Sequence, residues 1–365
     1  MKKIFLLLIG CAFLLPYQAT ACTIPVYRYA LEKWELTPYE ILVFHRGGLP
    51  IDVQKAIQKW SKTPLKANID ITLVDLDAKM APHLEKLWQR EGNDKQTPWM
   101  LVRYQAANAK EPSAWTGPCT TANLQNVIDS PQRQAILAHL QRGVTGVFVL
   151  LKSGDEKADN AAYEMALREL QSLEKKIKLP VQSKDGPQLR LPLPLQVVLP
   201  IVMLDRNRPE EAAFVRLLLA TEEGLDKVKG PILLPIFGRG RVLGSLSAEE
   251  LNEDQVQQVT KFLCRECSCE LKELNPGVDM LLAADWNAIF DKMFEVKETS
   301  PVEKPVASVE SAPTPISAVP SETEGVIEAT PSQCVVCQNW LWIATGIAAG
   351  LVLVTGAWAC FSFWK

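Results

Sequence analysis

The amino-acid sequence predicts an α/β protein with two tandem folded units, a disordered linker and one C-terminal transmembrane helix. Three observations lead to this prediction. Between residues 22 and 295, apolar runs typical of strands alternate with segments of helical spacing. Residues 296–333 are rich in proline and glutamate, and residues 340–364 carry no charged side chain.

Length and composition set the class of protein. The chain has 365 residues, of which 47% are hydrophobic and 22% charged, and this balance excludes a wholly disordered chain. The formal net charge is -3, from 39 Lys and Arg against 42 Asp and Glu. Nucleic-acid binding requires a basic surface that neutralises phosphates, so we expect no nucleic-acid partner.

The first 21 residues have the layout of a secretory signal peptide. A positive start at Lys2 and Lys3 precedes an apolar run, and Ala19 and Ala21 supply the small residues that cleavage requires. Cleavage would leave Cys22 as the first residue of the mature protein. Cys22 is also a candidate for lipidation, although Ala19 stands where lipoprotein signals usually carry leucine.

The first folded unit, residues 22–142, alternates strands and helices. Strands are predicted at residues 39–46, 69–76 and 99–102, and helices at 52–60, 84–90 and 121–140. Pro131 is expected to interrupt the last helix, because proline lacks the N–H that a helix interior needs. A fourth strand is not clear in this half.

The second unit, residues 143–295, repeats the alternation more completely. Strands are predicted at 146–152, 196–204, 232–237 and 242–246, and helices at 161–178, 209–220 and 252–263. A proline-rich insertion covers residues 179–195. The resulting order, β-α-β-α-β-β-α, is that of the thioredoxin fold.

We therefore expect two tandem thioredoxin-like domains, the first of them degenerate. Each half carries a proline just before its third strand, Pro98 and Pro231, and this bond is often cis in thioredoxin-like proteins. One larger doubly wound sheet across both halves is the alternative.

The C-terminal part predicts a tether to a membrane. Residues 296–333 contain no Leu, Phe, Trp or Tyr, so they cannot bury enough apolar surface to become ordered. A juxtamembrane segment, 334–339, leads to residues 340–364, which are long enough to span a bilayer once. Gly346 and Gly350 form a small-xxx-small pattern, on which we base the expectation of a homodimer. The folded domains are expected on the extracytoplasmic, periplasmic side of the cytoplasmic membrane.

Four motifs resemble those of an uncharacterised family of exported, membrane-anchored bacterial proteins. They are CTIPVYRYALEKW at residues 22–34, FGRGR at 237–241, CSC at 267–269 and NPGVD at 275–279. The resemblance covers most of the folded part. It implies export and membrane anchoring, and it brings no activity and no catalytic residue with it.

Cysteines are absent where thioredoxins carry their reactive pair. That pair follows the first strand at a helix N-terminus, where the thiol pKa is lowered. The corresponding positions here are residues 45–48, HRGG, and residues 153–156, SGDE. Ordinary thioredoxin chemistry is therefore not expected.

Other cysteines remain as candidates. Cys264, Cys267 and Cys269 follow the last helix of the second half, and three interpretations stay open: a redox disulfide, a soft-metal site for Zn²⁺ or Cu⁺, and a structural disulfide. Cys22 and Cys119 are candidate partners for the structural disulfide. Cys334 and Cys337 favour a local or interchain disulfide, because no ordered region would position a substrate there.

Histidines and arginines give weaker signals. His45, at a strand end, is the histidine with the best position for a functional role. The spacing of the three histidines indicates no pair that would bind a metal. Arg239 and Arg241 could grip a carboxylate or phosphate, but a hairpin turn with solvated charges is the preferred interpretation.

The sequence thus favours a non-enzymatic, membrane-tethered binding or scaffold protein that serves a membrane or envelope complex, with no cofactor. The alternative is a thiol-disulfide oxidoreductase or metal-handling protein that uses Cys264, Cys267 and Cys269.

Overall fold

The computed structural model describes residues 23–61, 67–104, 111–184, 186–247, 250–267 and 272–299. All of them lie in the first of two compact units, which spans Met1–Val302. The predicted signal peptide, most of the linker, the juxtamembrane segment and the span at 340–364 lie outside the described residues, as do Cys22 and Cys269. Among the described helices, none is long and apolar enough to cross a membrane.

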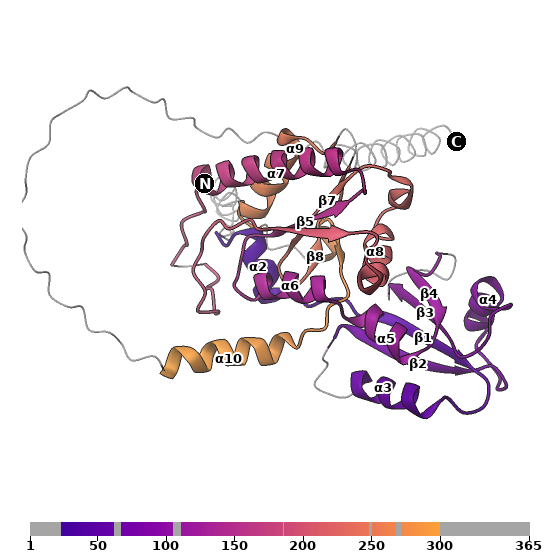
Figure 1. The fold of residues 1–365 in the computed structure, drawn as a ribbon. Helices are drawn as coiled ribbons and strands as arrows, with labels where there is room; N and C mark the ends of the chain where they lie inside the picture. The colour runs from indigo at the N-terminus through magenta and orange to yellow at the C-terminus, as the bar shows by residue number, and fades with distance from the viewer. Residues whose placement is uncertain are drawn as a thin grey trace, which may run out of the picture. The chain divides into compact units, whose positions relative to one another are not determined.

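The described chain is an α/β structure with two sheets, as the alternating pattern predicts (Figure 1). The first sheet has the order β2-β1-β3-β4. Its strands are β1 Tyr39–His45, β2 Ile69–Asp75, β3 Trp99–Tyr104 and β4 Trp115–Pro118, and its helices are α3 Ile51–Ser61, α4 Pro82–Glu91 and α5 Thr121–Ile128. Strand β1 runs parallel to β2 and antiparallel to β3, and β4 is antiparallel to β3.

Both faces of the first sheet are covered by helices. In β1, Ile41 and Val43 pack with Ile57 of α3 and Leu124 of α5, whereas Phe44 packs on the opposite face. On that second face, the Phe44 ring stacks on Trp88 of α4 with ring centroids 5.0 Å apart. Burial on both faces explains why this strand is a continuous apolar run and shows no polar alternation.

The second sheet has the order β10-β8-β7-β5-β6, with β9 paired to β7. Its strands are β5 Val147–Lys152, β6 Ile201–Asp205, β7 Ile232–Phe237, β8 Arg241–Val242, β9 Leu246–Ser247 and β10 Val278–Asp279. Helices α7 Glu156–Lys176 and α9 Glu253–Cys264 cover one face. Helices α6 Pro131–Leu140, α8 Ala212–Leu219 and α10 Trp286–Thr299 cover the other, and short 3-10 helices lie at Pro209–Glu211, Leu225–Lys227 and Lys272–Leu274.

The two halves repeat one arrangement. In each, the first two strands are parallel and joined through a helix, and the third and fourth strands add antiparallel on the other side. The order β6-β5-β7-β8 therefore matches β2-β1-β3-β4. The fourth strand of the first half, which the sequence left unclear, is the four-residue β4. The Thr97–Pro98 peptide bond is cis.

Two helices that precede residue 143 in the chain, α2 and α6, pack on the second sheet. Helix α2, Val26–Lys33, joins a cluster with Phe237 and Leu263, and a bridge pairs Pro25 with Glu266. Helix α6 begins at Pro131, as the sequence indicates, and it packs against β5 and β6. Because α3, α5 and α4 already cover the first sheet, these helices complete the second half instead. The domain boundary between residues 142 and 143 stays a prediction.

Residues 279–282 connect the two halves by hydrogen bonds. The Tyr39 hydroxyl donates to the Asp279 carbonyl oxygen at 2.9 Å, and the Leu282 N–H donates to Asn68 Oδ1 at 2.8 Å. Leu281 lies in the core of the first half, while Leu282 lies in that of the second. This segment follows β10, so one short stretch of chain contributes to both cores.

Candidate functional site

The turn after β1, where the predicted thioredoxin-like fold would place reactive thiols, is polar and solvated. The His45 Nδ1 lies 2.8 Å from the Gly47 carbonyl oxygen, and Arg46 pairs with Asp77 at 2.6 Å on the exposed surface. Gly47 has φ +56°, a conformation that favours glycine. The turn holds no nucleophilic side chain that is activated by a neighbour.

The equivalent turn after β5 is closed by a buried carboxylate. The Ser153 N–H, the Ser153 hydroxyl and the Gly154 N–H all donate to Asp159, at 2.7, 2.7 and 3.1 Å. Burial opposes the charge of Asp159, but these hydrogen bonds outweigh it and hold the pKa of Asp159 below its usual value. The backbone donors of this turn are therefore already used by the chain itself.

Two of the three cysteines that follow the last predicted helix, Cys264 and Cys267, lie inside the body of the second half. Cys264 is the last residue of α9 and is 4% exposed, and Cys267 is 3% exposed. The Cys267 N–H donates to the Ile24 carbonyl oxygen at 2.9 Å, so the cluster adjoins the N-terminal segment. Cys269 lies outside the described residues.

Thiol reactivity is suppressed by burial. Burial raises the pKa of the Cys264 thiol to about 12, and it raises the pKa of the Cys119 thiol in the first-half core to about 11. Both are free thiols in this structure. Desolvation alone accounts for the direction.

No metal site forms among the described residues. Within them, no three His, Cys, Asp or Glu side chains come together in a way that could hold an ion. His139 lies at the end of α6, where burial and then Arg142 lower its pKa. Its Nδ1 lies 3.1 Å from the Arg142 guanidinium, so this ring nitrogen already faces a positive charge of the chain itself.

Arg239 is half-buried and Arg241 is buried, which corrects the sequence-based interpretation of solvated charges. Arg239 donates to the carbonyl oxygens of Leu31 and Glu32 at 2.9 and 3.0 Å, so it caps the C-terminal end of α2. Arg241 is 8% exposed and pairs with Asp279 at 3.2 Å. The chain's own oxygens occupy both guanidinium groups, which leaves neither arranged to grip an external anion.

Asp279 is the centre of a network that sequence reasoning missed. Its carboxylate accepts from Arg241, from the Lys272 ammonium and from the Thr37 N–H at 2.8 Å. The FGRGR and NPGVD motifs are both visible in the sequence and supply Arg241 and Asp279. The pairing of Arg241 with Asp279 was not visible in the sequence, because β8 and β10 become neighbours only in the folded sheet.

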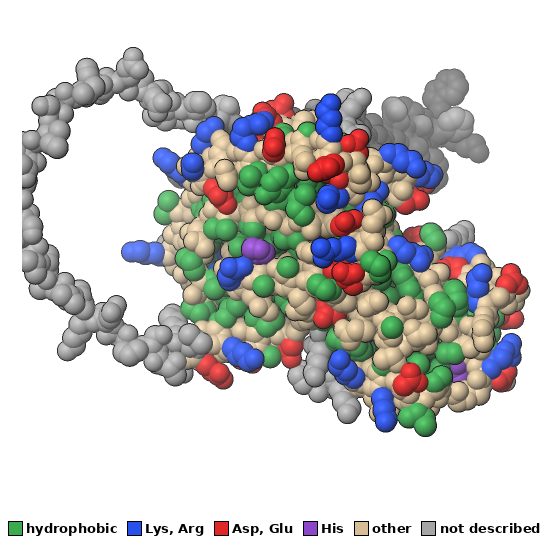
Figure 2. Space-filling model, viewed as in Figure 1, with side chains coloured by type: hydrophobic (Ala, Val, Ile, Leu, Met, Phe, Trp, Pro, Cys, Tyr) green, Lys and Arg blue, Asp and Glu red, His purple; other side chains and the backbone are tan. Residues whose placement is uncertain are grey.

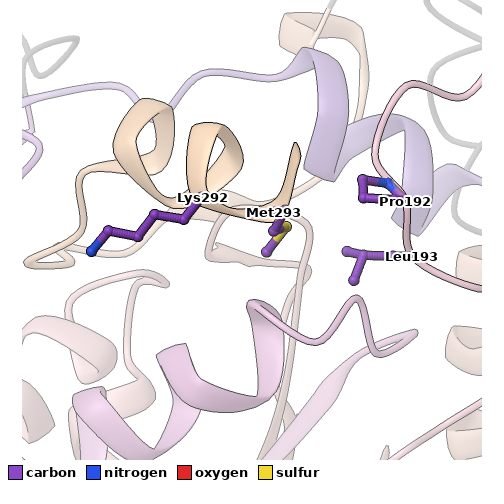
Figure 3. A pocket seen from close by; sticks show the side chains of 4 residues that line it. All are labelled: Pro192, Leu193, Lys292 and Met293. Carbon is purple, nitrogen blue, oxygen red and sulfur yellow. The ribbon is translucent and has the colours of Figure 1, made fainter. Parts of the chain in front are cut away.

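A shallow cavity lies beside α10, the last described helix. It has a volume of about 330 Å³ and is lined by Pro192 and Leu193 of the proline-rich insertion and by Lys292 and Met293 of α10. Figure 3 shows the Leu193 and Met293 side chains on either side of the open space, while Lys292 extends away from it. Its volume is at the lower end of ligand pockets, which span roughly 300–1,000 Å³.

A second, smaller cavity lies where the halves meet. It measures about 190 Å³ and is lined by Trp115, Asn123 and Asn126 of the first half and by residues of the α8 region, including Arg216. The Arg216 guanidinium lies 5.8 Å from the Trp115 ring centroid, so these two residues already satisfy each other. A volume of about 190 Å³ is also below the range of roughly 300–1,000 Å³ that is typical of ligand pockets.

Comparison with known proteins adds no functional assignment. No family model matches the chain, and no curated protein matches it. The function has to be argued from the site itself.

Proposed function

We propose that this chain is a non-enzymatic binding or scaffold protein, tethered to the cytoplasmic membrane and serving a membrane or envelope complex on the extracytoplasmic side. The observation that carries the proposal is the state of the two turns. The turn after β1 has no thiol, and the turn after β5 is closed by Asp159. Neither turn offers a cysteine thiol for disulfide chemistry.

Both halves are proposed to be thioredoxin-like. The support is their common order, with a parallel first pair, an antiparallel third and fourth strand, and helices between the first three strands. Such a fold without reactive cysteines keeps a rigid sheet and exposed loops, which are properties suited to binding.

The location is proposed from the chain ends. The signal-peptide pattern at 1–21 supports export, and the uncharged residues 340–364 support a single span. A homodimer through Gly346 and Gly350, and disulfides at Cys334 and Cys337, belong to the same proposal. The resemblance to exported, membrane-anchored bacterial proteins is consistent with it.

A protein partner is favoured over nucleic acid. On the face shown in Figure 2, acidic and basic side chains are interspersed, and neither sign forms a continuous field. The net charge of -3 supports the same choice.

The oxidoreductase or metal-handling alternative receives less support. It needs an accessible thiolate, whereas Cys264 and Cys267 are buried and the pKa of Cys264 is raised to about 12. Cys269 remains the member of the cluster on which this alternative depends.

Two assays test the proposal. The purified soluble part should reduce an insulin-type disulfide no faster than a variant without cysteines, and a rate abolished by Cys267→Ser would overturn the non-enzymatic assignment. Truncation after Gln333 should move the protein from the membrane to the soluble fraction. If the truncated chain stays in the membrane, mass spectrometry of its N-terminal peptide would show whether Cys22 carries a lipid.

A further inference from the structure

A lysine-rich stretch, here called the lysine segment, runs from the end of α7 into the proline-rich insertion. It covers residues 175–184, which carry four lysines and no acidic residue, although the whole chain has a net charge of -3. Lys175 and Lys176 are the last two residues of α7, and Lys178 and Lys184 follow in the insertion. All four are exposed, and none of them forms an ion pair within the described part of the chain.

Val181 lies inside the lysine segment and is exposed. At 89%, it is the most exposed large hydrophobic residue among those that the structure describes. The loop around it is held in place, because Leu179 packs on the apolar cluster of α2 and Gln182 Nε2 donates to the Pro180 carbonyl oxygen at 3.2 Å. A single exposed apolar side chain is ordinary on a protein surface. Val181 differs because it lies in the middle of a basic segment.

The same loop holds the N-terminal end of the described chain. Gln182 Nε2 donates to the Thr23 carbonyl oxygen at 2.8 Å, and the Ser183 N–H donates to the Thr23 hydroxyl oxygen at 2.8 Å. In the predicted mature chain only Cys22 precedes Thr23. The lysine segment is therefore next to the point at which the predicted signal peptide would hold the chain at the membrane during export.

We propose that the lysine segment is a membrane-docking surface, with which the second half binds the anionic phospholipid surface of a bilayer. The proposal rests on the membrane location proposed above. Four ammonium groups complement the phosphates of anionic headgroups, and each lysine close to such a surface strengthens binding roughly fivefold. The Val181 side chain enters the boundary between headgroups and acyl chains, where the apolar residues of peripheral membrane segments are buried.

A lipid surface fits these residues better than a small ligand or an acidic protein. Neither of the two cavities described above is lined by a residue of the lysine segment. Protein interfaces have an apolar centre and are depleted in lysine. In the lysine segment, by contrast, lysines predominate, and Val181 is the one exposed apolar residue.

The predicted tether makes a weak contact sufficient. Residues 300–333 of the predicted linker, treated as a flexible chain, have ends roughly 30 Å apart. A flexible linker of this kind keeps two attached groups at an effective concentration in the millimolar range, on the order of 1 mM. The lysine segment therefore needs only a low affinity for the bilayer to be docked for much of the time.

Photo-crosslinking of the full chain in lipid nanodiscs tests the docking. The nanodiscs contain a phospholipid with a photoreactive diazirine in its acyl chain, and mass spectrometry after chymotryptic digestion locates the attached lipid. When phosphatidylglycerol is included, the peptide that contains Val181 should be labelled at least about tenfold more than in nanodiscs of phosphatidylcholine alone. Raising the salt from about 0.1 to about 0.5 M should reduce this labelling about fivefold, because the Debye length falls from about 10 to about 4 Å.

One variant tests the apolar residue. Val181→Asp should reduce labelling of its peptide at least about tenfold, because it places a negative charge against anionic headgroups and removes the inserted side chain. Leu274→Asp is the matched control, since Leu274 is 67% exposed and lies outside the lysine segment. Far-UV circular dichroism verifies that each variant remains folded.

A second variant tests the charges. Replacement of all four lysines of the segment by glutamine should reduce labelling of the Val181 peptide at least about tenfold in nanodiscs that contain phosphatidylglycerol. The control removes the same number of charges elsewhere and should leave this labelling unchanged. It replaces by glutamine four exposed lysines outside the segment, which are Lys55, Lys79, Lys86 and Lys229.

The outcomes separate failure of the docking from failure of the proposed function. Labelling confined to residues 340–364 would overturn the docking and leave the proposed span intact. Labelling in neither region would remove the proposed membrane location itself, and the docking with it. Equal labelling with and without phosphatidylglycerol would overturn the proposal, because the lysines would then play no part. If, in isolated cell membranes, the lysines cross-link to a protein and the Val181 peptide carries no lipid, the surface is a protein interface and the proposal fails.

Discussion

Replacement of Asp279 by alanine should weaken the contacts between the two halves more than the substitution of any exposed residue. The Asp279 carboxylate is 5% exposed and accepts from Arg241 at 3.2 Å, from the Thr37 N–H at 2.8 Å and from Lys272. Thr37 precedes the first strand, whereas Arg241 lies in the second sheet, so the carboxylate connects segments of both halves.

The magnitude follows from what alanine leaves behind. Removing one partner of a buried ion pair costs about 3–5 kcal/mol, because the other charge stays buried. Arg241 would keep its hydrogen bonds to the carbonyl oxygens of Asn275 and Pro276, at 2.8 and 3.0 Å, which places the loss near the lower limit. The Thr37 N–H loses its acceptor and adds about 1 kcal/mol. We expect Asp279→Ala to lower the free energy of unfolding by about 3–4 kcal/mol.

Urea denaturation of residues 22–299, followed by circular dichroism and tryptophan fluorescence, measures this loss. In the wild type the circular dichroism and fluorescence transitions should have the same urea midpoint. In Asp279→Ala the two midpoints should differ if the halves no longer unfold together. Glu273→Ala is the control. Glu273 follows Lys272 in the chain and is exposed, so its replacement should change stability by no more than about 0.5 kcal/mol. A loss below about 1 kcal/mol for Asp279→Ala would show that solvent replaces the carboxylate and would refute the reasoning.

Three further predictions concern the turns, the thiols and the halves. Asp159→Asn should lower stability at pH 7 by about 1–3 kcal/mol. Because the pKa of Asp159 is lowered by folding, the wild type should lose this advantage as the pH falls from about 5 towards 2, whereas urea midpoints that differ equally at pH 7 and 3 would contradict the assignment. Alkylation of Cys264 and Cys119 at pH 8, followed by mass spectrometry, should be about a thousandfold slower in the native protein than in urea, and comparable rates would contradict their burial. Residues 22–142 and 143–295, expressed apart, should each lack cooperative unfolding by circular dichroism, since α2 and α6 are then separated from the sheet on which they pack. Two cooperative fragments would support independent domains.

Strongly patterned elements were predictable from the sequence because burial alone determines them. The run Ile41 to Phe44 is apolar at every position, and it forms a strand buried on both faces. Strand β4 was not predictable, because it has only four residues and two of them, Gly117 and Pro118, disfavour strands. It becomes a strand by pairing with β3, for example Thr116 with Leu101, and that pairing depends on tertiary structure.

The sheet on which a helix packs was harder to predict than the helix itself. Helix α6 begins after Ser130 and Pro131, which are clear start signals, but the sequence does not say which sheet it covers. Helix α2 is short and follows the predicted cleavage site, and no strand precedes it to suggest a partner. Its fully buried Arg28 became understandable only when Leu191 and Leu193 supplied carbonyl acceptors.

The sequence predicted which reactive residues the candidate site lacks better than it predicted which interactions the site contains. Missing cysteines at residues 45–48 and 153–156 are a direct property of the sequence. The role of Asp159 depends on the first turns of α7, which bring a residue six positions from Ser153 back onto the turn. The phase of α9 likewise decides that Cys264 is buried, and a count of neighbouring charges cannot reveal it.

The distribution of polar contacts has a consequence for which parts of the chain open first. The body is held by buried polar networks around Arg28, Asp159 and Asp279, whereas residues 286–294 of α10 have none within the described structure. Stability of the body and release of α10 should therefore respond to different substitutions. Asp159→Asn should lower the free energy of global unfolding and leave the exchange of α10 unchanged relative to the wild type, and Phe290→Ala should do the reverse.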